Sequence, residues 1–382
     1  MAVAPQPAPL PQFLPHLLAA WQLGTDADTD ISRPEHGTNN QTFLVARAGQ
    51  RFVLRISENL ILAQVQAEQR LLRRLGRAGL PFAVPEPLAA TDGKTVIETP
   101  AGPATLSRWL PGVLPDFGSE AALERFGRAV GVLGQALQQV PPADAPQDWL
   151  SSPLPVPVDG PDGEGLWREL RAAGVSGEQA ALLARLAAGF TQWWAGAVGT
   201  LPVQVVHGDL AASNVLADPE TGRVSALLDF EIAGAYLRVQ DFMVALYQSG
   251  ALEGPAWPGR SAAFARGHAS VRALTAAEVE TLPELLVSRL VGSVLWRAAR
   301  WRRGQARLVE VVDRIDRLET TMRWLAVHGE ELVALVIAQF HDIPLGLSKL
   351  HPWIAARVCS GDVLISFMSA GNKCAAISFR CD

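Results

Sequence analysis

The sequence has few cysteines and lacks the segments expected of a secreted or membrane-spanning protein. Its three cysteines, Cys359, Cys374 and Cys381, all lie close to the C-terminal end. The body of the chain therefore has neither a disulfide framework nor a thiol-rich metal site, which favours a reducing cytoplasm. Residues 1–15 are rich in proline and alanine and do not have the basic start and apolar core of a secretory signal. No apolar run approaches the roughly 20 residues needed to cross a bilayer, so we expect a cytoplasmic protein without a membrane anchor.

Charged residues are also scarce, at 19% of the chain, and the net charge is −5. This balance provides no general attraction to nucleic acids or anionic membranes. The basic residues are nearly all arginine, because the only lysines are Lys94, Lys349 and Lys373. Apolar residues make up 49% of the 382 residues, enough for more than one hydrophobic core. We therefore expect a packed globular protein that binds neither nucleic acid nor membrane.

The first 110 residues are predicted to form a lobe of strands with one main helix. Four runs are typical of strands bounded by turns: 41–46, 51–56, 94–99 and 104–110. The first two runs and the last two runs are each expected to form a hairpin. Apolar residues in 64–77 are spaced for one buried face of a helix, and a short helix is expected over 13–21.

The chain from residue 111 to about 335 is predicted to be mainly helical. Helical spacing of apolar residues occurs in 123–137, 179–198, 279–303 and 309–327. Residues 141–163 are rich in Pro, Asp and Gly and are expected to be a surface loop. The apolar runs 203–206 and 224–228 are expected to pair as strands. Residues 336–382 lose the periodicity and are treated as a C-terminal extension of unclear structure.

The residues best suited to chemistry lie in the segment His207-Gly208-Asp209, with Asn214 five positions after the aspartate and Asp229 at the end of the next apolar run. Phosphoryl transfer needs a carboxylate near the attacking hydroxyl and oxygen ligands that hold Mg²⁺ on the phosphates. We expect Asp209 to accept the hydroxyl proton, Asn214 and Asp229 to bind the metal, and His207 to brace the loop. A plain turn is the alternative, since Asp and Asn are common turn residues.

This spacing, followed by Asp-Phe-Glu at 229–231, resembles the aminoglycoside phosphotransferase, choline kinase and homoserine kinase superfamily. Residues 37–45 and 52–56 are similar to the nucleotide lobe of type II homoserine kinases, and the resemblance covers about residues 15–330. It implies a protein-kinase-like α+β fold with a small β-rich lobe (residues 1–110) and a larger helical lobe (111–335). ATP, or another nucleoside triphosphate, would bind between the lobes together with Mg²⁺.

The resemblance also implies a nucleotide-binding loop and a hinge. The loop is formed by Gly37, Thr38, Asn39 and Asn40, although in isolation these residues would equally suit a turn between strands. Arg108 and Leu110 lie in a segment similar to the family's hinge.

Two charged residues are implied to contact or support the nucleotide. Arg55 occupies the position at which protein kinases have a lysine for the α- and β-phosphates, and its planar guanidinium is not equivalent to an ammonium. Glu68 stands where the family has an acidic partner for that basic residue, with a solvated surface charge as the alternative. Asp241 resembles an aspartate that steadies the catalytic loop, or it is a charge favoured at a helix N-terminus.

A basic run near the C-terminal end has three interpretations. It consists of Arg289, Arg297, Arg300, Arg302, Arg303 and Arg307, with Trp296 and Trp301 between them. Such a run can bind nucleic acid, or it can be a helix with one solvated face and one core stripe. In the third interpretation one or two arginines face the cleft and hold a substrate carboxylate.

The third interpretation and the homoserine kinase resemblance together predict the acceptor. We expect a small-molecule kinase that phosphorylates homoserine or a related hydroxylated amino acid. Aminoglycosides, choline and amino sugars are the alternative acceptors. A catalytically inactive nucleotide-binding module is the alternative of another class, because Arg55 departs from the kinase pattern.

Overall fold

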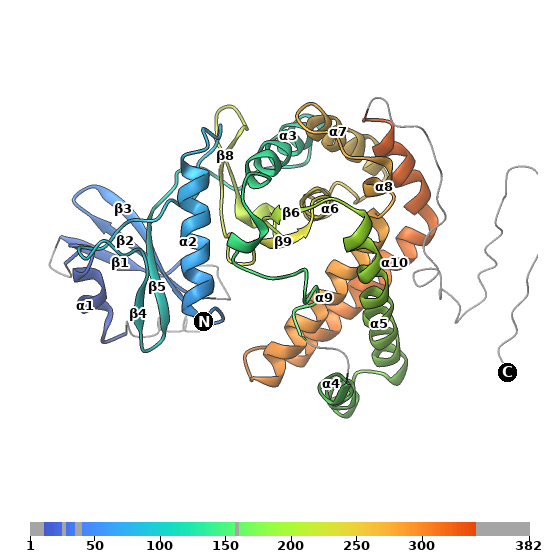
Figure 1. Cartoon of the computed structure of the whole chain (residues 1–382), viewed down its shortest axis with the longest axis horizontal. Helices are drawn as coiled ribbons and strands as arrows, with labels where there is room; N and C mark the ends of the chain where they lie inside the picture. Colours follow the sequence, from blue (N-terminus) through green and yellow to red (C-terminus); the bar gives the residue numbers. More distant parts are fainter. Residues whose placement is uncertain (1–10, 25–27, 35–39, 157–159, 341–382) are drawn as a thin grey trace, which may run out of the picture.

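The computed structural model describes residues 11–24, 28–34, 40–156 and 160–340. Figure 1 shows a β-rich N-terminal lobe beside a larger, mainly helical C-terminal lobe, with helix α2 between the sheet and the second lobe. This α+β arrangement of two lobes confirms the predicted fold class.

The N-terminal lobe is built on a five-stranded antiparallel sheet in the order β1-β2-β3-β5-β4. Its strands are β1 (Thr29–Ser32), β2 (Asn40–Arg47), β3 (Gln50–Ser57), β4 (Ile97–Thr99) and β5 (Gly102–Arg108). Both predicted hairpins are present, as β2–β3 and β4–β5. The edge strand β1 was not predicted from the sequence.

Successive side chains of a strand point to opposite faces of the sheet, so the sheet has one face toward the core with α1 and one face toward the cleft. Phe43 of β2 pairs with Leu54 of β3, and both pack with the short helix α1 (Leu14–Ala19). On the other face, Thr42 pairs with Arg55, which pairs with Thr105 of β5. This second face lines the cleft between the lobes.

Helix α2 (Leu62–Gly76) matches the predicted helix closely. Val65, Leu71, Leu72 and Leu75 are all buried, as their spacing predicted. The last three of these residues belong to the core of the C-terminal lobe rather than to the core beneath the sheet. The helix, which follows β3 in the chain, therefore packs its apolar face into the C-terminal lobe.

The C-terminal lobe contains eight described α-helices. They are α3 (Glu120–Leu137), α4 (Gly160–Ala172), α5 (Gly177–Thr200), α6 (Gln240–Gln248), α7 (Trp257–Ala269), α8 (Ala276–Val279), α9 (Leu282–Arg302) and α10 (Leu308–Ile337). Among the described helices, none is long and apolar enough to cross a membrane.

Several helical boundaries differ from the sequence prediction. The predicted helix 279–303 is two helices, since α8 ends at Val279 and α9 has a proline in its first turn. Helix α10 continues to Ile337, well beyond residue 327. The predicted loop 141–163 contains a 3₁₀ turn (Pro142–Asp144) and the start of α4. Helices α4, α6 and α7 were missed.

The predicted pairing of 203–206 with 224–228 is wrong. Strand β6 (Val203–Val206) pairs with β9 (Gly234–Leu237), and β8 (Val224–Leu227) pairs with β7 (Val215–Ala217). Residues 218–223 connect β7 to β8 directly, so these two neighbouring strands form a hairpin. Strand β6 therefore pairs with β9, which lies further along the chain. The antiparallel β6–β9 pair, with Val206 opposite Gly234, brings the loops that follow β6 and precede β9 together.

Candidate active site

A cleft of about 980 Å³ between the lobes contains most of the residues that the sequence singled out. Its lining includes Asn40, Arg55, Glu68, Arg108, Leu110, Asp209, Asn214 and Asp229. The loop residues Gly37, Thr38 and Asn39 lie outside the described residues. His207 is fully buried behind the lining.

The carboxylate of Asp209 is held from two sides. Asn214 donates from Nδ2 to the Asp209 backbone oxygen at 2.9 Å and to Oδ2 at 3.2 Å. A 3₁₀ turn (Ala212–Asn214) bends the chain back so that this contact can form. The other oxygen, Oδ1, forms an ion pair with the guanidinium of Arg289 from α9. Asp209 remains 29% exposed, so it is open to a molecule in the cleft.

Asp241 fixes the backbone of the same loop. Its two carboxylate oxygens accept hydrogen bonds from the backbone N–H groups of His207 and Gly208, each at 2.8 Å. Gly208 has φ +83°, a conformation that glycine adopts without strain. Burial raises the pKa of Asp241, while the two backbone N–H groups oppose the shift. These contacts support the loop-steadying role that the resemblance implied.

His207 connects the loop to the segment that carries Asp229. Its Nδ1 accepts a hydrogen bond from the Asp209 backbone N–H at 3.2 Å, so the ring proton is on Nε2. Nε2 in turn donates to the Leu228 carbonyl at 2.9 Å. Burial lowers the pKa of His207, which keeps the ring neutral. These contacts support the bracing role expected of His207, whose side chain is buried and does not line the cleft.

Asp229 and Asn214 are oxygen donors that fit a divalent cation. Asp229 has φ +63°, a strained conformation for a residue with a side chain, and strain of this kind concentrates at functional sites. Because Nδ2 of Asn214 is committed to Asp209, its amide oxygen is the atom left for a metal. The described residues contain no group of three or more His, Cys, Asp or Glu that could hold a metal. One amide and one carboxylate suit Mg²⁺, which takes most of its ligands from water and phosphate.

The pKa of Asp229 is raised to about 7, first by burial and then by the nearby carboxylate of Glu231. Arg55 opposes this shift from 3.6 Å away. The carboxyl group is still 35% exposed toward the cleft. A cation bound there would favour the charged form of Asp229.

Arg55 and Glu68 form an ion pair on the cleft face of the sheet. Glu68 is 1% exposed, which excludes the alternative of a solvated surface charge. Burial raises the pKa of Glu68, and the guanidinium counteracts it. Burial also acts to lower the pKa of Arg55, but Glu68, Asp229 and Glu231 outweigh it and the net shift is upward. Arg55 thus stands as a fixed cation at the cleft face of β3.

The segment between the lobes passes close to the C-terminal lobe. Leu110 and Arg108 both line the cleft, and Arg108 is exposed and donates a hydrogen bond to Gln50 Oε1 at 3.4 Å. Gly112 has φ +145°, and a Cβ there would lie 2.8 Å from the Cβ of Leu216. Only glycine therefore lets the chain cross at this distance.

The cleft also contains an arginine cluster, which we define as Arg289 and Arg297 of α9 and Arg314 and Arg317 of α10. Two members of the basic run thus line the cleft, as the third interpretation proposed. The rest of the run does not line it: Arg302 binds Glu169 on the surface, and Arg307 is 82% exposed. Arg314 and Arg317 were missed, because they lie on another helix and outside the run.

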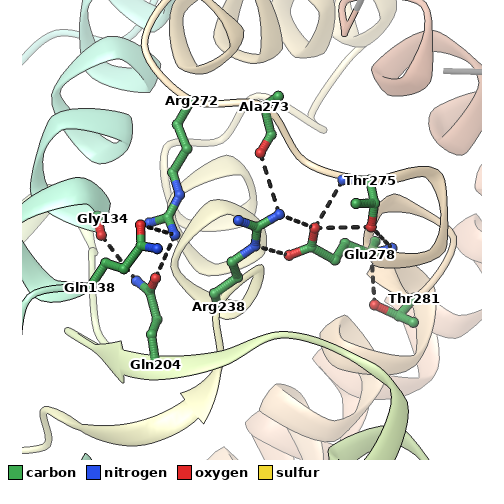
Figure 2. A network of polar contacts seen from close by, with 9 residues as sticks. All are labelled: Gly134, Gln138, Gln204, Arg238, Arg272, Ala273, Thr275, Glu278 and Thr281. Atoms are coloured by element: carbon green, nitrogen blue, oxygen red, sulfur yellow. Dashed lines mark hydrogen bonds and ion pairs between the residues drawn. The ribbon is translucent and has the colours of Figure 1, made fainter. Parts of the chain in front are cut away.

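A polar network fixes β6, the strand that precedes the loop 207–214, and its partner β9 (Figure 2). Gln204 of β6 accepts a hydrogen bond from Arg272 at 2.6 Å and donates to the Gly134 carbonyl of α3 at 3.2 Å. Arg238, directly after β9, forms an ion pair with the fully buried carboxylate of Glu278 in α8. Strand β6 is therefore tied to α3, and the end of its partner β9 is tied to α8.

Comparison with known proteins agrees with this geometry. The model of the phosphotransferase enzyme family (APH) matches residues 30–274. The homoserine kinase of Azorhizobium caulinodans is 30% identical over 298 residues, covering 74% of this chain and 84% of the relative. The homoserine kinase of Sinorhizobium medicae is 30% identical over 295 residues, covering 74% and 82%.

Solved structures of similar fold are also kinases. An aminopropanol kinase associated with a microcompartment has a TM-score of 0.63 at 19% identity, covering 86% of this chain and 99% of its own. An amicoumacin kinase solved with AMP-PNP and Ca²⁺ has a TM-score of 0.58 at 17% identity, covering 76% and 88%. At these identities the likeness shows a shared kinase-like fold.

Proposed function

Because this chain belongs to the phosphotransferase enzyme family and is a small-molecule kinase, we propose that it transfers the γ-phosphoryl group of ATP, with Mg²⁺, to the hydroxyl of homoserine or a closely related hydroxylated amino acid. The observation that carries this proposal is the meeting of Asp209, Asn214, Asp229 and Arg55 in one cleft. Nucleotide and divalent-metal use is supported by the amicoumacin kinase, whose structure holds AMP-PNP and Ca²⁺.

In the proposed reaction the acceptor hydroxyl oxygen forms a bond to the γ-phosphorus, and the bond from that phosphorus to the oxygen of ADP breaks. Asp209 takes the hydroxyl proton as the new bond forms. Asn214 keeps the carboxylate oriented by its contact with Oδ2. Mg²⁺, held by Asn214 and Asp229, supplies charge neutralisation on the phosphate oxygens when it is bound.

Arg55 is proposed to bind the phosphates from the cleft face of β3. Its ion pair with Glu68 supports this role, because the lysine of protein kinases is paired with an acidic residue in the same way. The position is therefore filled by a cation that suits phosphate binding, and nothing in its geometry favours an inactive binding module.

The choice of acceptor is supported by charge. Homoserine carries a carboxylate, whereas choline and aminoglycosides are cations that call for acidic groups or an aromatic cage. The arginine cluster supplies forked donors suited to a carboxylate. The relatives named homoserine kinases point to the same acceptor.

The direct test is an acceptor panel with purified protein and MgATP. We expect phosphorylation of homoserine or a similar small hydroxylated amino acid, with little product from kanamycin or choline. Robust turnover of kanamycin without turnover of homoserine would refute the acceptor and leave the kinase assignment standing.

The catalytic base is tested with Asp209→Asn. The amide cannot take the hydroxyl proton, so turnover should fall by at least about a hundredfold, while nucleotide binding remains. Steady-state assays and calorimetric titration with a nonhydrolysable nucleotide measure the two effects. Asp313→Asn, on the exposed side of α10, is the matched control. Wild-type turnover in Asp209→Asn would exclude Asp209 as the base.

A further inference from the structure

We propose that Arg314 of α10 binds the carboxylate of the acceptor, and that this contact makes the enzyme select alcohols that carry a carboxylate. The proposal rests on the proposed function and assigns its acceptor specificity to one side chain. Neither the basic run in the sequence nor the catalytic motif contains this residue.

The first argument is that Arg314 lacks an acidic partner among the described residues, whereas both cluster arginines of α9 have one. Arg289 is paired with Asp209, and Arg297 is paired with Glu310 at 2.9 Å. Within the described part of the chain, Arg314 forms no ion pair, and its Nε is buried without a hydrogen-bond partner. A half-buried guanidinium in this state is costly, and such groups concentrate at functional sites.

The second argument is the surrounding charge. Burial lowers the pKa of Arg314, and the like charges of Arg297 and Arg317 lower it further. An anion bound at this point would remove both penalties, because it would pair with Arg314 and offset the repulsion among the three guanidinium groups. The cleft is thus preorganised for a negative group at α10.

The third argument concerns the acids of the same cleft. Four carboxylates line it, and each already has a partner: Glu68 and Asp229 contact Arg55, Asp209 contacts Arg289, and Glu231 accepts a hydrogen bond from Asn40 at 2.6 Å. An acceptor with only a cationic group would therefore meet carboxylates that are all engaged. An acceptor carboxylate would meet the guanidinium of Arg314, which has no acidic partner in the described ranges.

The phosphates of the nucleotide are the other anions that could approach Arg314. The structure favours the acceptor, because the phosphates already have a cation in Arg55 of the N-terminal lobe, whereas Arg314 lies on α10 of the C-terminal lobe. The two roles differ in which substrate's KM depends on Arg314, so kinetics can separate them.

The test compares homoserine with 3-aminopropan-1-ol, which keeps the hydroxyl and the amine but lacks the carboxylate. Wild-type protein should prefer homoserine by at least about a hundredfold in kcat/KM. Arg314→Gln should raise the KM for homoserine by about ten- to a hundredfold, the scale of a lost hydrogen bond to a charged group. The KM for ATP and the kcat/KM for 3-aminopropan-1-ol should not change. Arg314→Lys should lie between Arg314→Gln and wild type.

The matched control is Arg323→Gln, which changes an exposed arginine of the same helix that does not line the cleft. It should leave the KM for homoserine, the KM for ATP and the kcat/KM for 3-aminopropan-1-ol unchanged. Circular dichroism establishes that each variant is folded. If Arg314→Gln does not fold, Arg314→Lys and the wild-type comparison of the two alcohols still decide the matter.

Three results would overturn the assignment: an unchanged KM for homoserine in Arg314→Gln, an equal loss for both alcohols, or a raised KM for ATP instead. If wild-type protein phosphorylates neither alcohol, the proposed function fails, and calorimetric binding of homoserine to wild-type and Arg314→Gln protein tests Arg314 separately. Equal affinity in that titration, or no binding to either, would then refute the role of Arg314.

Discussion

Burial distinguishes Asp209 of the loop 207–214 from Asp241 of α6, which contacts the same loop. Asp209 is 29% exposed and faces the cleft, whereas Asp241 is 3% exposed and accepts two backbone N–H groups of the catalytic loop. In the proposed reaction the first carboxylate meets the acceptor, and the second holds the backbone that positions the first. At the residue scale, function therefore depends on the environment of an aspartate more than on its type.

The raised pKa of Asp229 predicts a pH-dependent affinity for the metal–nucleotide complex. Below its pKa of about 7 the group is mostly protonated and must release its proton to bind a cation. Affinity should therefore rise with pH, by up to about tenfold per unit, and level off above about pH 7. Calorimetric titrations of Mg²⁺ and a nonhydrolysable nucleotide from about pH 5.5 to about 8.5 measure this dependence.

Asp229→Asn and Asp229→Ala are the variants for comparison. Both should bind metal–nucleotide more weakly and lose the pH dependence, because the titrating group is gone.

The raised pKa of Asp229 also means that its carboxyl group holds its proton more tightly in the folded than in the unfolded protein. Its contribution to the free energy of unfolding therefore falls as pH rises from its ordinary pKa toward about 7. A wild-type affinity independent of pH would contradict this account.

Arg55 should contribute more to nucleotide binding than to turnover. Arg55→Ala removes a contact that is equal in ground and transition states, so the KM for ATP should rise more than kcat falls. The variant also leaves Glu68 buried without a partner, at a cost of about 3–5 kcal/mol in stability. Steady-state kinetics and chemical denaturation measure the two effects. Arg55→Lys, which keeps the cation, should recover part of both, and an unchanged KM in Arg55→Ala would separate Arg55 from the phosphates.

At the scale of elements, α3 and α7 pack so closely that their backbones touch. A Cβ added at Gly127 of α3 would clash with the carbonyl oxygen of Phe264 in α7. A Cβ at Gly267 of α7 would clash with the carbonyl oxygen of Glu124 in α3. The two helices can therefore approach this closely only because both positions are glycine.

Gly127→Ala should lower the free energy of unfolding by at least about 1–3 kcal/mol, which is the usual cost of overpacking a core. The cost should not be smaller, because the atoms that obstruct the new methyl group belong to the backbone and cannot move aside. Chemical denaturation monitored by circular dichroism measures the change. Gly196→Ala in α5 is the matched control, since a Cβ there meets nothing within 4 Å. It should be neutral or stabilising by up to about 1 kcal/mol through helix propensity. Equal stability of the two variants would show that α3 and α7 separate without cost.

At the scale of the whole molecule, polar contacts join the lobes across the cleft. Asn40 donates to Glu231 at 2.6 Å, Gln64 donates to Gln147 at 2.7 Å, and Arg55 lies 3.6 Å from Asp229. The proposed nucleotide and metal ligands come from both lobes, so binding should hold the lobes together.

We therefore expect metal-dependent stabilisation of the entire chain by nucleotide. At about 100 times its Kd, a nonhydrolysable ATP analogue with Mg²⁺ should add about 2.7 kcal/mol to the stability of the folded state. Thermal melting with and without a chelator measures this effect. Asp229→Ala should lose the part that depends on metal, whereas Asp209→Asn should retain it. An equal shift with and without metal would place the metal elsewhere.

The sequence by itself determined what local patterns encode. Alternating apolar residues predicted β2 and β3, helical spacing predicted α2 and α3, and the short spacing from His207 to Asn214 predicted a catalytic loop whose residues lie together in the structure. These features were readable because the residues that interact are neighbours in the chain, so their spacing records the geometry.

Tertiary structure alone decided the contacts between distant residues. The pairing of β6 with β9, the ion pair of Arg289 with Asp209 across 80 positions, and the place of Arg314 in the cleft have no local signature. Each depends on how whole elements pack, and packing is set by the combined burial of many side chains rather than by the spacing of a few. The sequence therefore predicted the chemistry of the cleft, and only the fold decided which arginines reach it.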